Sequence, residues 1–263
     1  MSLVFSAIVP HPPVLIPNIG KENLDKLEQT RLAMEKLEQD LYSAKPEVIF
    51  IISPHGQLNP DYFTVNLSDK FTINFEDFGN FSDQLNFKGD MVLFTVNKEK
   101  IAENNKLNII SESVLDHGIG VPLFYLMRHL AEVPIVPIYF SMLDNQAHYE
   151  FGKSLKDLIL KTEKRVAVIA SADLSHCLTK DSPAPYNPEG KVFDEKLIKI
   201  IESCDSLSLV NLDSKLIESA EECGLRSILI LFGIIGDMQC QPEILSYEYP
   251  FGVGYLVANI KIS

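Results

Sequence analysis

The chain has 263 residues, of which 46% are hydrophobic and 22% are charged, and its formal net charge at pH 7 is -13. This composition is ordinary for a soluble globular protein, and the length is sufficient for a sizeable core. The acidic balance argues against nucleic acid or an anionic membrane surface as a partner. The longest apolar run, residues 228–235, is too short to span a bilayer.

The first predicted elements form a βαβ unit. An apolar run over 3–9 predicts a strand, the leucine spacing over 21–43 predicts an amphipathic helix, and residues 47–53 predict a second strand. The two strands should be parallel, with a right-handed crossover. Residues 62–75 alternate as one or two strands, and we expect the polar segment 76–88 to be a mobile loop or lid.

The rest of the chain continues this alternation. In chain order we expect a helix over 89–104, a strand over 107–110, a helix over 120–130, strand 134–140, a helix over 146–161, strand 164–171, helices over 190–203, 206–220 and 224–236, and a closing hairpin of strands 242–249 and 252–261. Two prolines place strand 134–140 near a sheet edge or at a bend. We therefore predict an α/β fold, a three-layer sandwich around a mostly parallel or mixed central sheet, in one domain over residues 1–263.

Two of the predicted strands end in the same way. Strand 3–9 runs into Pro10-His11-Pro12-Pro13, and strand 47–53 runs into Pro54-His55-Gly56. Prolines fix φ and remove backbone donors, so each histidine should lie on a stiff turn. In open α/β sheets, ligands bind outside the carboxyl ends of the strands.

His117 and His176 are in comparable places, since His117 lies in a Leu-Asp-His-Gly turn and His176 closes the segment Ala-Asp-Leu-Ser-His after strand 164–171. A single histidine at a strand end is usually a core or surface residue. Four histidines at such ends are expected to converge, because strand ends of one sheet meet at one edge. Two other histidines, His129 and His148, lie in helical stretches.

Neutral imidazoles at fixed positions are common metal ligands. Two histidines and a carboxylate with open positions are typical of non-haem Fe(II) sites that activate dioxygen. The candidate carboxylates are Glu221 and Glu222, at the junction of two predicted helices, where the alternative is a solvated or helix-capping acid. Asp116 and Asp173 are rival ligands or partners that orient the imidazoles.

The sequence lacks the motifs that mark several other kinds of functional site. No GxGxxG follows the first strand and there is no P-loop, so a nucleotide site has no phosphate cradle. Neither HExxH nor GxSxG occurs in the sequence. The four cysteines show no CxxC spacing, and we predict that they are reduced, as in a cytoplasmic protein.

The motifs together resemble a known family. VPHPP, SPHG, the DHG turn, ADLSH, APYNPEGKVFD and ECG occur in this order between residues 5 and 258. This ordered set is similar to that of the class III extradiol ring-cleavage dioxygenases, of the catalytic B-subunit type of protocatechuate 4,5-dioxygenase. It also resembles the wider superfamily that includes the Memo proteins.

The resemblance implies roles for individual residues. His11 and His55 match the two histidine ligands of the iron. His176 matches the acid–base catalyst beside the substrate, and His117 matches a further histidine that lines the pocket.

The third ligand in the dioxygenases is a glutamate near the start of a late helix. Glu222 is the closest match and Glu221 is the less close one. Memo-type members have a cysteine in this neighbourhood, and Cys223-Gly224 resembles that version.

The resemblance favours an Fe(II)-dependent extradiol dioxygenase that opens the ring of a catechol-type aromatic with O2, in aromatic compound catabolism. The expected partners are a small aromatic diol and O2, together with a second copy of the chain or a capping subunit, and the expected location is the cytoplasm. One alternative is a Memo-like metal-binding protein without dioxygenase activity. Another is a zinc-dependent hydrolase that uses the same ligands, since zinc also accepts two histidines and a carboxylate.

Overall fold

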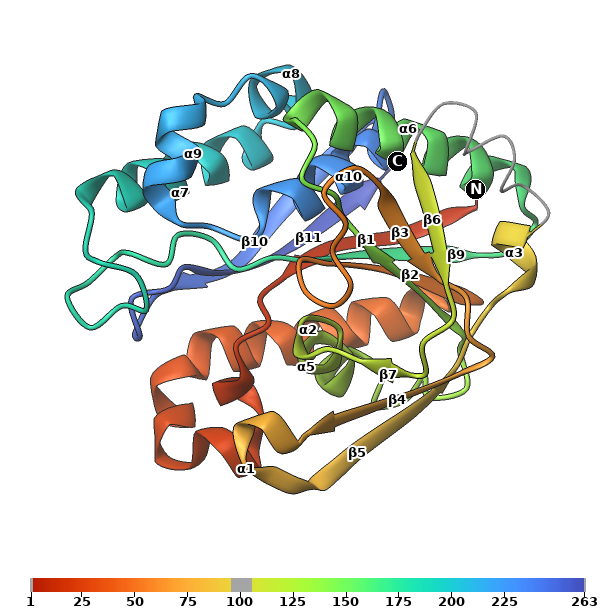
Figure 1. The fold of residues 1–263 in the computed structure, drawn as a ribbon, viewed down its shortest axis with the longest axis horizontal. Coiled ribbons are helices and arrows are strands. Elements are labelled where there is room, and N and C mark those ends of the chain that lie inside the picture. Colours follow the sequence, from red (N-terminus) through yellow and green to blue (C-terminus); the bar gives the residue numbers. More distant parts are fainter. Residues whose placement is uncertain (1, 96–105, 263) are drawn as a thin grey trace.

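A computed structural model describes residues 2–95 and 106–262 (Figure 1). The main sheet has eight strands in the order β10-β11-β1-β9-β2-β8-β3-β6. In chain order they are β1 (Leu3–Val9), β2 (Val48–Ser53), β3 (Phe63–Asn66), β6 (Leu107–Ile110), β8 (Ile135–Tyr139), β9 (Val166–Ser171), β10 (Cys240–Glu248) and β11 (Tyr255–Ile262). The predicted α/β class with a central mixed sheet is confirmed.

Four neighbouring strands, β1, β9, β2 and β8, run parallel to one another. Their residues are almost entirely buried, as expected of apolar, β-branched strands that are covered on both faces. The antiparallel strands β10, β11 and β3 extend the sheet on either side. Because the four central strands point the same way, their carboxyl ends meet at one edge.

Helices cover both faces of the sheet (Figure 1). One face carries α6 (Asn145–Lys161), α7 (Pro188–Glu202), α8 (Ser206–Val210), α9 (Ser214–Ala220) and α10 (Leu225–Ile235). The other face carries α1 (Pro17–Gly20), α2 (Glu28–Ala44), α5 (His117–Leu126) and a second sheet of β4 (Lys70–Phe75), β5 (Asn80–Lys88) and β7 (Val114–Leu115). Each face buries its own apolar cluster, so the protein has three layers.

Local sequence explains where several helices begin. The side chains of Asp116, Asp144, Asn187 and Asp213 each accept a backbone N–H in the first turn of α5, α6, α7 and α9. Pro188 then occupies the first position of α7, where its missing N–H has no consequence.

The prediction of a loop over 76–88 is wrong. After a 3₁₀ turn at Glu76–Phe78, β5 pairs antiparallel with β4. Most residues of β5 are exposed or partly exposed, so the strand lacks the apolar alternation by which a half-buried strand is recognised.

The expected edge position of strand 134–140 is also wrong, because β8 lies between β2 and β3. Pro137 is tolerated there because the register with β3 includes only Ile138 and Tyr139. The predicted helix 206–220 is divided into α8 and α9. In the predicted helix 89–104, the structure describes α3 (Val92–Thr95), and residues 96–104 lie outside the described residues.

The prediction that all four cysteines are reduced is wrong for one pair. Cys204, after α7, forms a disulfide with Cys240, the first residue of β10. These residues are 36 positions apart, and no spacing rule connects them. Cys177 and Cys223 are free thiols.

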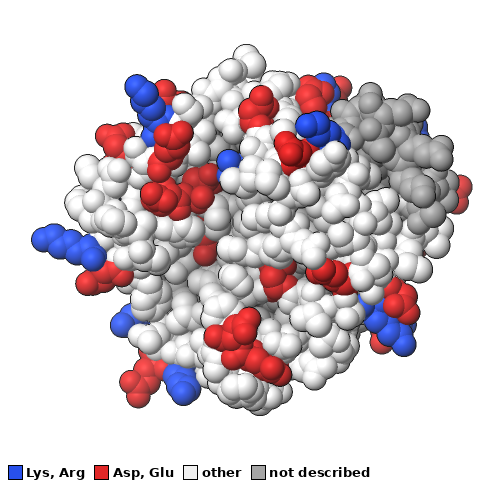
Figure 2. Space-filling model, in the orientation of Figure 1, with Lys and Arg blue, Asp and Glu red and all other residues white. Residues whose placement is uncertain are grey.

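The surface reflects the acidic composition. Acidic side chains are spread over the face in Figure 2, whereas the Lys and Arg side chains lie mostly toward its margin. None of the described helices combines the length and the hydropathy that a membrane-spanning segment needs.

Candidate metal centre

The carboxyl ends of β1 and β9 place His11 beside Asp173. The backbone N–H of His11 donates a hydrogen bond to Oδ1 of Asp173 at 2.8 Å. Pro10 and Pro12 flank His11 and make the turn stiff, so this bond fixes a chain segment that has few alternative conformations. His11 is 2% exposed, and its ring lines a cavity of about 440 Å³.

Hydrogen bonding defines which nitrogen of His11 carries the proton. Oγ of Ser171 donates its hydrogen to the carbonyl oxygen of Gly118 at 2.5 Å and lies 2.9 Å from Nδ1 of His11. Since that hydroxyl hydrogen is already donated, Oγ accepts from Nδ1–H. Nε2 of His11 therefore presents a lone pair to the cavity, as a metal ligand must.

His55 follows β2 and meets His11 at the cavity. Its Nε2 lies 3.1 Å from Nε2 of His11, and the two rings are edge to face. The start of α5 packs closely against this turn, because Gly118 has no side chain: a Cβ there would lie 2.5 Å from Oγ of Ser53 and 3.0 Å from Cδ2 of His55. Asp116 accepts from Oγ of Ser53 at 2.9 Å, which ties the same helix start to β2.

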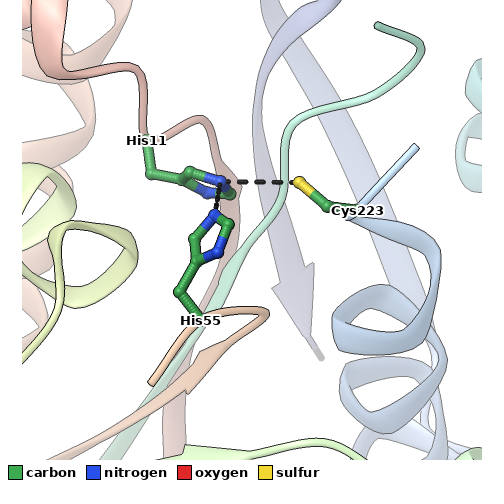
Figure 3. A group of neighbouring side chains, drawn as sticks. All are labelled: His11, His55 and Cys223. Carbon is green, nitrogen blue, oxygen red and sulfur yellow. Dashed lines mark hydrogen bonds between the residues drawn. The ribbon is translucent and has the colours of Figure 1, made fainter. Parts of the chain in front are cut away.

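Cys223 completes a group of three donor atoms (Figure 3). Its Sγ lies 3.5 Å from Nε2 of His11, and the ligand atoms of His11, His55 and Cys223 are all within 4.8 Å of one another. Cys223 precedes α10, and Gly224 lets this helix start approach β9, because a Cβ at Gly224 would lie 2.7 Å from the carbonyl oxygen of Asp173.

The predicted glutamate ligands are not part of this group. Oε2 of Glu222 accepts the backbone N–H of Leu225 at 2.6 Å, in the first turn of α10, so this carboxylate has the capping contact that was the alternative. Glu221 adopts a left-handed conformation with φ of 53° and is exposed. Glu221 lines the cavity, and its carbonyl oxygen accepts from Nδ1 of His176.

His176 is oriented by that carbonyl. Because Nδ1–H donates to Glu221, Nε2 carries the lone pair, and it lies 3.8 Å from Sγ of Cys223. Burial lowers the pKa of His176, which keeps the ring neutral near pH 7. His176 is therefore arranged to accept a proton from a ligand in the cavity.

His117 lines the same cavity at the first position of α5. The centroid of its ring lies 4.3 Å from that of the His55 ring and 5.1 Å from that of the Phe78 ring. The structure thus brings together the four histidines that the sequence placed at strand ends and turns. His129 and His148 are elsewhere, since His129 pairs with Glu38 and His148 contacts the backbone carbonyls of Asp144 and Ser141.

The donor atoms fit a metal ion. Two imidazole nitrogens on one tetrahedral zinc ion lie about 3.3 Å apart, and a nitrogen and a thiolate sulfur lie about 3.5 Å apart, by the usual bond lengths. The corresponding distances between His11 and His55 and between His11 and Cys223 are 3.1 Å and 3.5 Å. The two distances from His11 therefore match a mononuclear site, and the ligand atoms of His55 and Cys223 lie within 4.8 Å of each other.

Electrostatics agree with this fit. Burial and the neighbouring histidines lower the pKa of His11 well below its usual value, and burial lowers the pKa of His55 to about 4, so both rings are neutral. Burial, followed by the carboxylates of Asp173 and Glu222, raises the pKa of Cys223 well above its usual value. A thiolate at Cys223 thus needs a positive charge beside it, which a metal ion supplies.

Sequence reasoning missed the residues that orient these ligands. Ser171 is the last residue of a buried strand and gave no signal of its own. The carbonyl of Glu221 is available only because that residue is left-handed, which is rare for a residue other than glycine.

Relatives of the chain include proteins of more than one kind. Protein CA_C1420 of Clostridium acetobutylicum is 33% identical over 271 residues, which cover 99% of this chain but only 58% of that protein. The 2-aminophenol 1,6-dioxygenase beta subunit of a Pseudomonas species is 23% identical over 229 residues, which cover 76% of this chain and 73% of that subunit. A MEMO1 family protein of Methanococcoides burtonii is 23% identical over 146 residues, which cover 50% of this chain and 53% of that protein.

The fold has a counterpart among solved structures. The uncharacterized protein JW3007 of Escherichia coli K12 superposes with a TM-score of 0.67 over 98% of this chain and 100% of that one, at 16% identity. At the level of sequence families, residues 6–258 match the family described as the catalytic LigB subunit of aromatic ring-opening dioxygenase. The chain therefore belongs to this family.

Proposed function

We propose that the protein is a metal-binding protein with a thiolate-ligated mononuclear centre, held by Nε2 of His11, Nε2 of His55 and Sγ of Cys223. The observation that supports this proposal most directly is the convergence of these three donor atoms within 4.8 Å, with both distances from Nε2 of His11 at metal-like values. Soft thiolate ligands favour zinc and copper(I), whereas the Fe(II) dioxygenase arrangement has a carboxylate in the third place. The sulfur therefore favours a Memo-like function over ring opening.

The ligand that we propose for the cavity is a small aromatic compound with two adjacent hydroxyl groups, or with a hydroxyl and an amino group. A metal ion at this site would polarise a coordinated hydroxyl and lower its pKa. Nε2 of His176 would accept the released proton, because its lone pair faces the same space as Cys223. His117 lines the same cavity, and its ring, which contacts the rings of His55 and Phe78, adds an aromatic surface to the cavity wall.

Extradiol ring opening with Fe(II) and O2 is the second candidate. The four convergent histidines and membership of the LigB family support it, as does the similarity to a subunit named as a 2-aminophenol dioxygenase. In this reaction His176 would have the acid–base role that the sequence implied.

Metal reconstitution under anaerobic conditions tests the proposal. The protein is loaded separately with Zn(II) and Fe(II), desalted, and its metal content is measured by mass spectrometry. We expect one equivalent of zinc and weaker retention of iron. Absence of any stoichiometric metal would overturn both candidate functions.

Oxygen uptake then separates the two candidates. The Fe(II)-loaded protein is mixed with catechol and with 2-aminophenol in an oxygen electrode, and the products are followed by absorbance. Retained metal without uptake supports the first candidate. Uptake of one O2 per substrate with a yellow ring-opened product would establish the second one in its place.

A further inference from the structure

We propose that Asp194, a buried residue of α7, is a positioning residue that holds the turn after β9 and with it His176 and the approach to Cys223. The consequence for metal affinity rests on the proposed function, whereas the consequence for the His176 ring does not. Asp194 belongs to the conspicuous segment APYNPEGKVFD, for which the metal centre itself provides no role. Its relative exposure is 0%.

Both oxygens of the Asp194 carboxylate are engaged. Oδ1 accepts the backbone N–H of Ser175 at 2.9 Å, and Oδ2 accepts the hydroxyl of Tyr247 at 2.6 Å. The Ser175 N–H lies in the middle of the turn, between Asp173, which bonds to His11, and His176. A carboxylate buried in this way is costly unless its hydrogen bonds are made, so the turn and Asp194 constrain each other.

The start of β11 closes the turn from the other side. Gly254 accepts from the N–H of Leu174 at 2.8 Å and donates to the carbonyl oxygen of Ser175 at 2.9 Å. A Cβ at Gly254 would lie 2.2 Å from Oδ2 of Asp194, so only glycine allows this approach. The turn is therefore held between the Asp194 carboxylate and one backbone segment, with little room to shift.

The same turn is bonded to the junction between α9 and α10. Oγ of Ser175 and the N–H of His176 both donate to the carbonyl oxygen of Ala220, each at 3.0 Å. The next carbonyl, that of Glu221, accepts from the ring of His176. Because Cys223 follows two residues later, a shift of the turn would move both the His176 ring and the segment that carries the sulfur.

Asp194→Ala, compared with Asp194→Asn, tests this role. Alanine leaves the Ser175 N–H without its acceptor, whereas the asparagine oxygen still accepts it and the asparagine amide can donate to Tyr247. Asp90→Ala is the matched control. Asp90 is also a buried acid, 7% exposed, that accepts backbone N–H groups from Val92 and Leu93. It bonds to Ile135 at the start of β8 and pairs with Lys164 just before β9, so it lies at the opposite edge of the sheet.

The first readout uses the metal-free protein. Long-range ¹H–¹⁵N spectra report which ring nitrogen of each histidine is protonated. We expect a single Nδ1–H form of His176 in the wild type, Asp90→Ala and Asp194→Asn, and a mixture of tautomers in Asp194→Ala. Should Asp194→Ala fail to fold, Tyr247→Phe removes one of the two bonds to the carboxylate and is measured in its place. A wild-type His176 spectrum in folded Asp194→Ala, or in Tyr247→Phe where the alanine variant does not fold, would overturn the proposal.

The second readout is the dissociation constant of zinc, measured by competition with a chelator. Substitution of a residue that orients a metal ligand typically weakens metal binding by roughly 10- to 100-fold. We expect the effect of Asp194→Ala to be near the lower end of this range. Asp194→Asn and Asp90→Ala should remain within about 2-fold of the wild type, the first because its bonds are retained. Equal zinc affinity in Asp194→Ala and Asp90→Ala would overturn the link to Cys223. Failure of the wild type to bind zinc would instead overturn the proposed function and leave the His176 readout valid.

Discussion

Sγ of Cys223 lies 3.5 Å from Nε2 of His11, on the side of the imidazole that carries the lone pair. The adjacent Glu222 faces α10, where its carboxylate caps the N–H of Leu225. One position in the chain therefore separates a soft donor from a hard one, and the two have different metal preferences.

Substitution of these neighbours should distinguish them. Cys223→Ala removes a proposed ligand. Its zinc affinity should therefore fall by more than the roughly 10- to 100-fold that follows substitution of a residue that only orients a ligand. Glu222→Gln should change zinc affinity far less than Cys223→Ala does, because it alters only a neighbouring charge, and stability should stay within about 1 kcal/mol, because the amide oxygen still accepts from Leu225. Chelator competition and urea unfolding measure the two quantities. The reverse pattern, with zinc lost from Glu222→Gln and kept by Cys223→Ala, would restore the glutamate as the ligand.

Ser171→Ala should impair the centre without removing a ligand. The substitution leaves Nδ1–H of His11 and the carbonyl of Gly118 without their shared partner, so His11 loses its fixed tautomer. We expect zinc affinity to fall by roughly 10- to 100-fold. Ser6→Ala is the control, since Ser6 is a buried serine of β1 that donates to the carbonyl of Ile260 at 2.6 Å. Both variants should lose about 1–3 kcal/mol of stability, and the same zinc affinity in both would contradict the role of Ser171.

Much of the arrangement was predictable because parallel strands end at a common edge. His11 and His55 each follow a short apolar strand and a proline, and this pattern alone placed them together. His176 follows β9 in the same way, although nothing in its neighbourhood indicated that a left-handed residue would supply the acceptor for its ring. The roles of these histidines stay predictions until metal binding is measured.

The rest depended on tertiary contacts that no local pattern encodes. The choice between Glu222 and Cys223 depends on the direction in which the chain turns at Glu221. The φ of 53° there accompanies long-range hydrogen bonds, in which the carbonyls of Ala220 and Glu221 accept from the backbone and the ring of His176. Strand β5 has polar residues on both sides because it is largely exposed, so it resembled a loop. The Cys204–Cys240 disulfide joins two elements that pack together only in the folded chain.

The stability of the metal-free protein should depend on pH through Asp194. Burial raises the pKa of this carboxyl to about 7 from the model-peptide value of 3.8. Because the folded protein binds this proton more tightly than the unfolded chain does, protonation of Asp194 stabilises the fold at low pH. This contribution is lost as the pH rises from about 4 through about 7. The free energy of unfolding of the wild type, relative to that of Asp194→Asn, should fall over this interval by at most about 1.4 kcal/mol per pH unit.

Urea unfolding at pH 5, 6, 7 and 8 measures this difference for the two metal-free proteins. Among the described residues, the titratable groups that act on the Asp194 carboxyl are Tyr247 and Glu222. Tyr247 has a raised pKa and stays protonated, and the pKa of Glu222 is also raised by burial. The comparison is therefore repeated in a Glu222→Gln background, where the slope should persist. A difference that grows as the pH rises would contradict a raised pKa.

The Cys204–Cys240 disulfide should stabilise the protein by restricting the unfolded chain. Closure of a loop between residues 36 positions apart corresponds to about 3–4 kcal/mol in the chain-entropy model. In a chain of this length, reduction should lower the melting temperature by roughly 10 °C. Thiol titration of the unfolded, non-reduced protein should find two groups, Cys177 and Cys223, and four after reduction. The variant with both Cys204→Ser and Cys240→Ser should melt at the same temperature with and without reductant. Four free thiols in the protein before reduction would show instead that these two cysteines are in contact without being bonded.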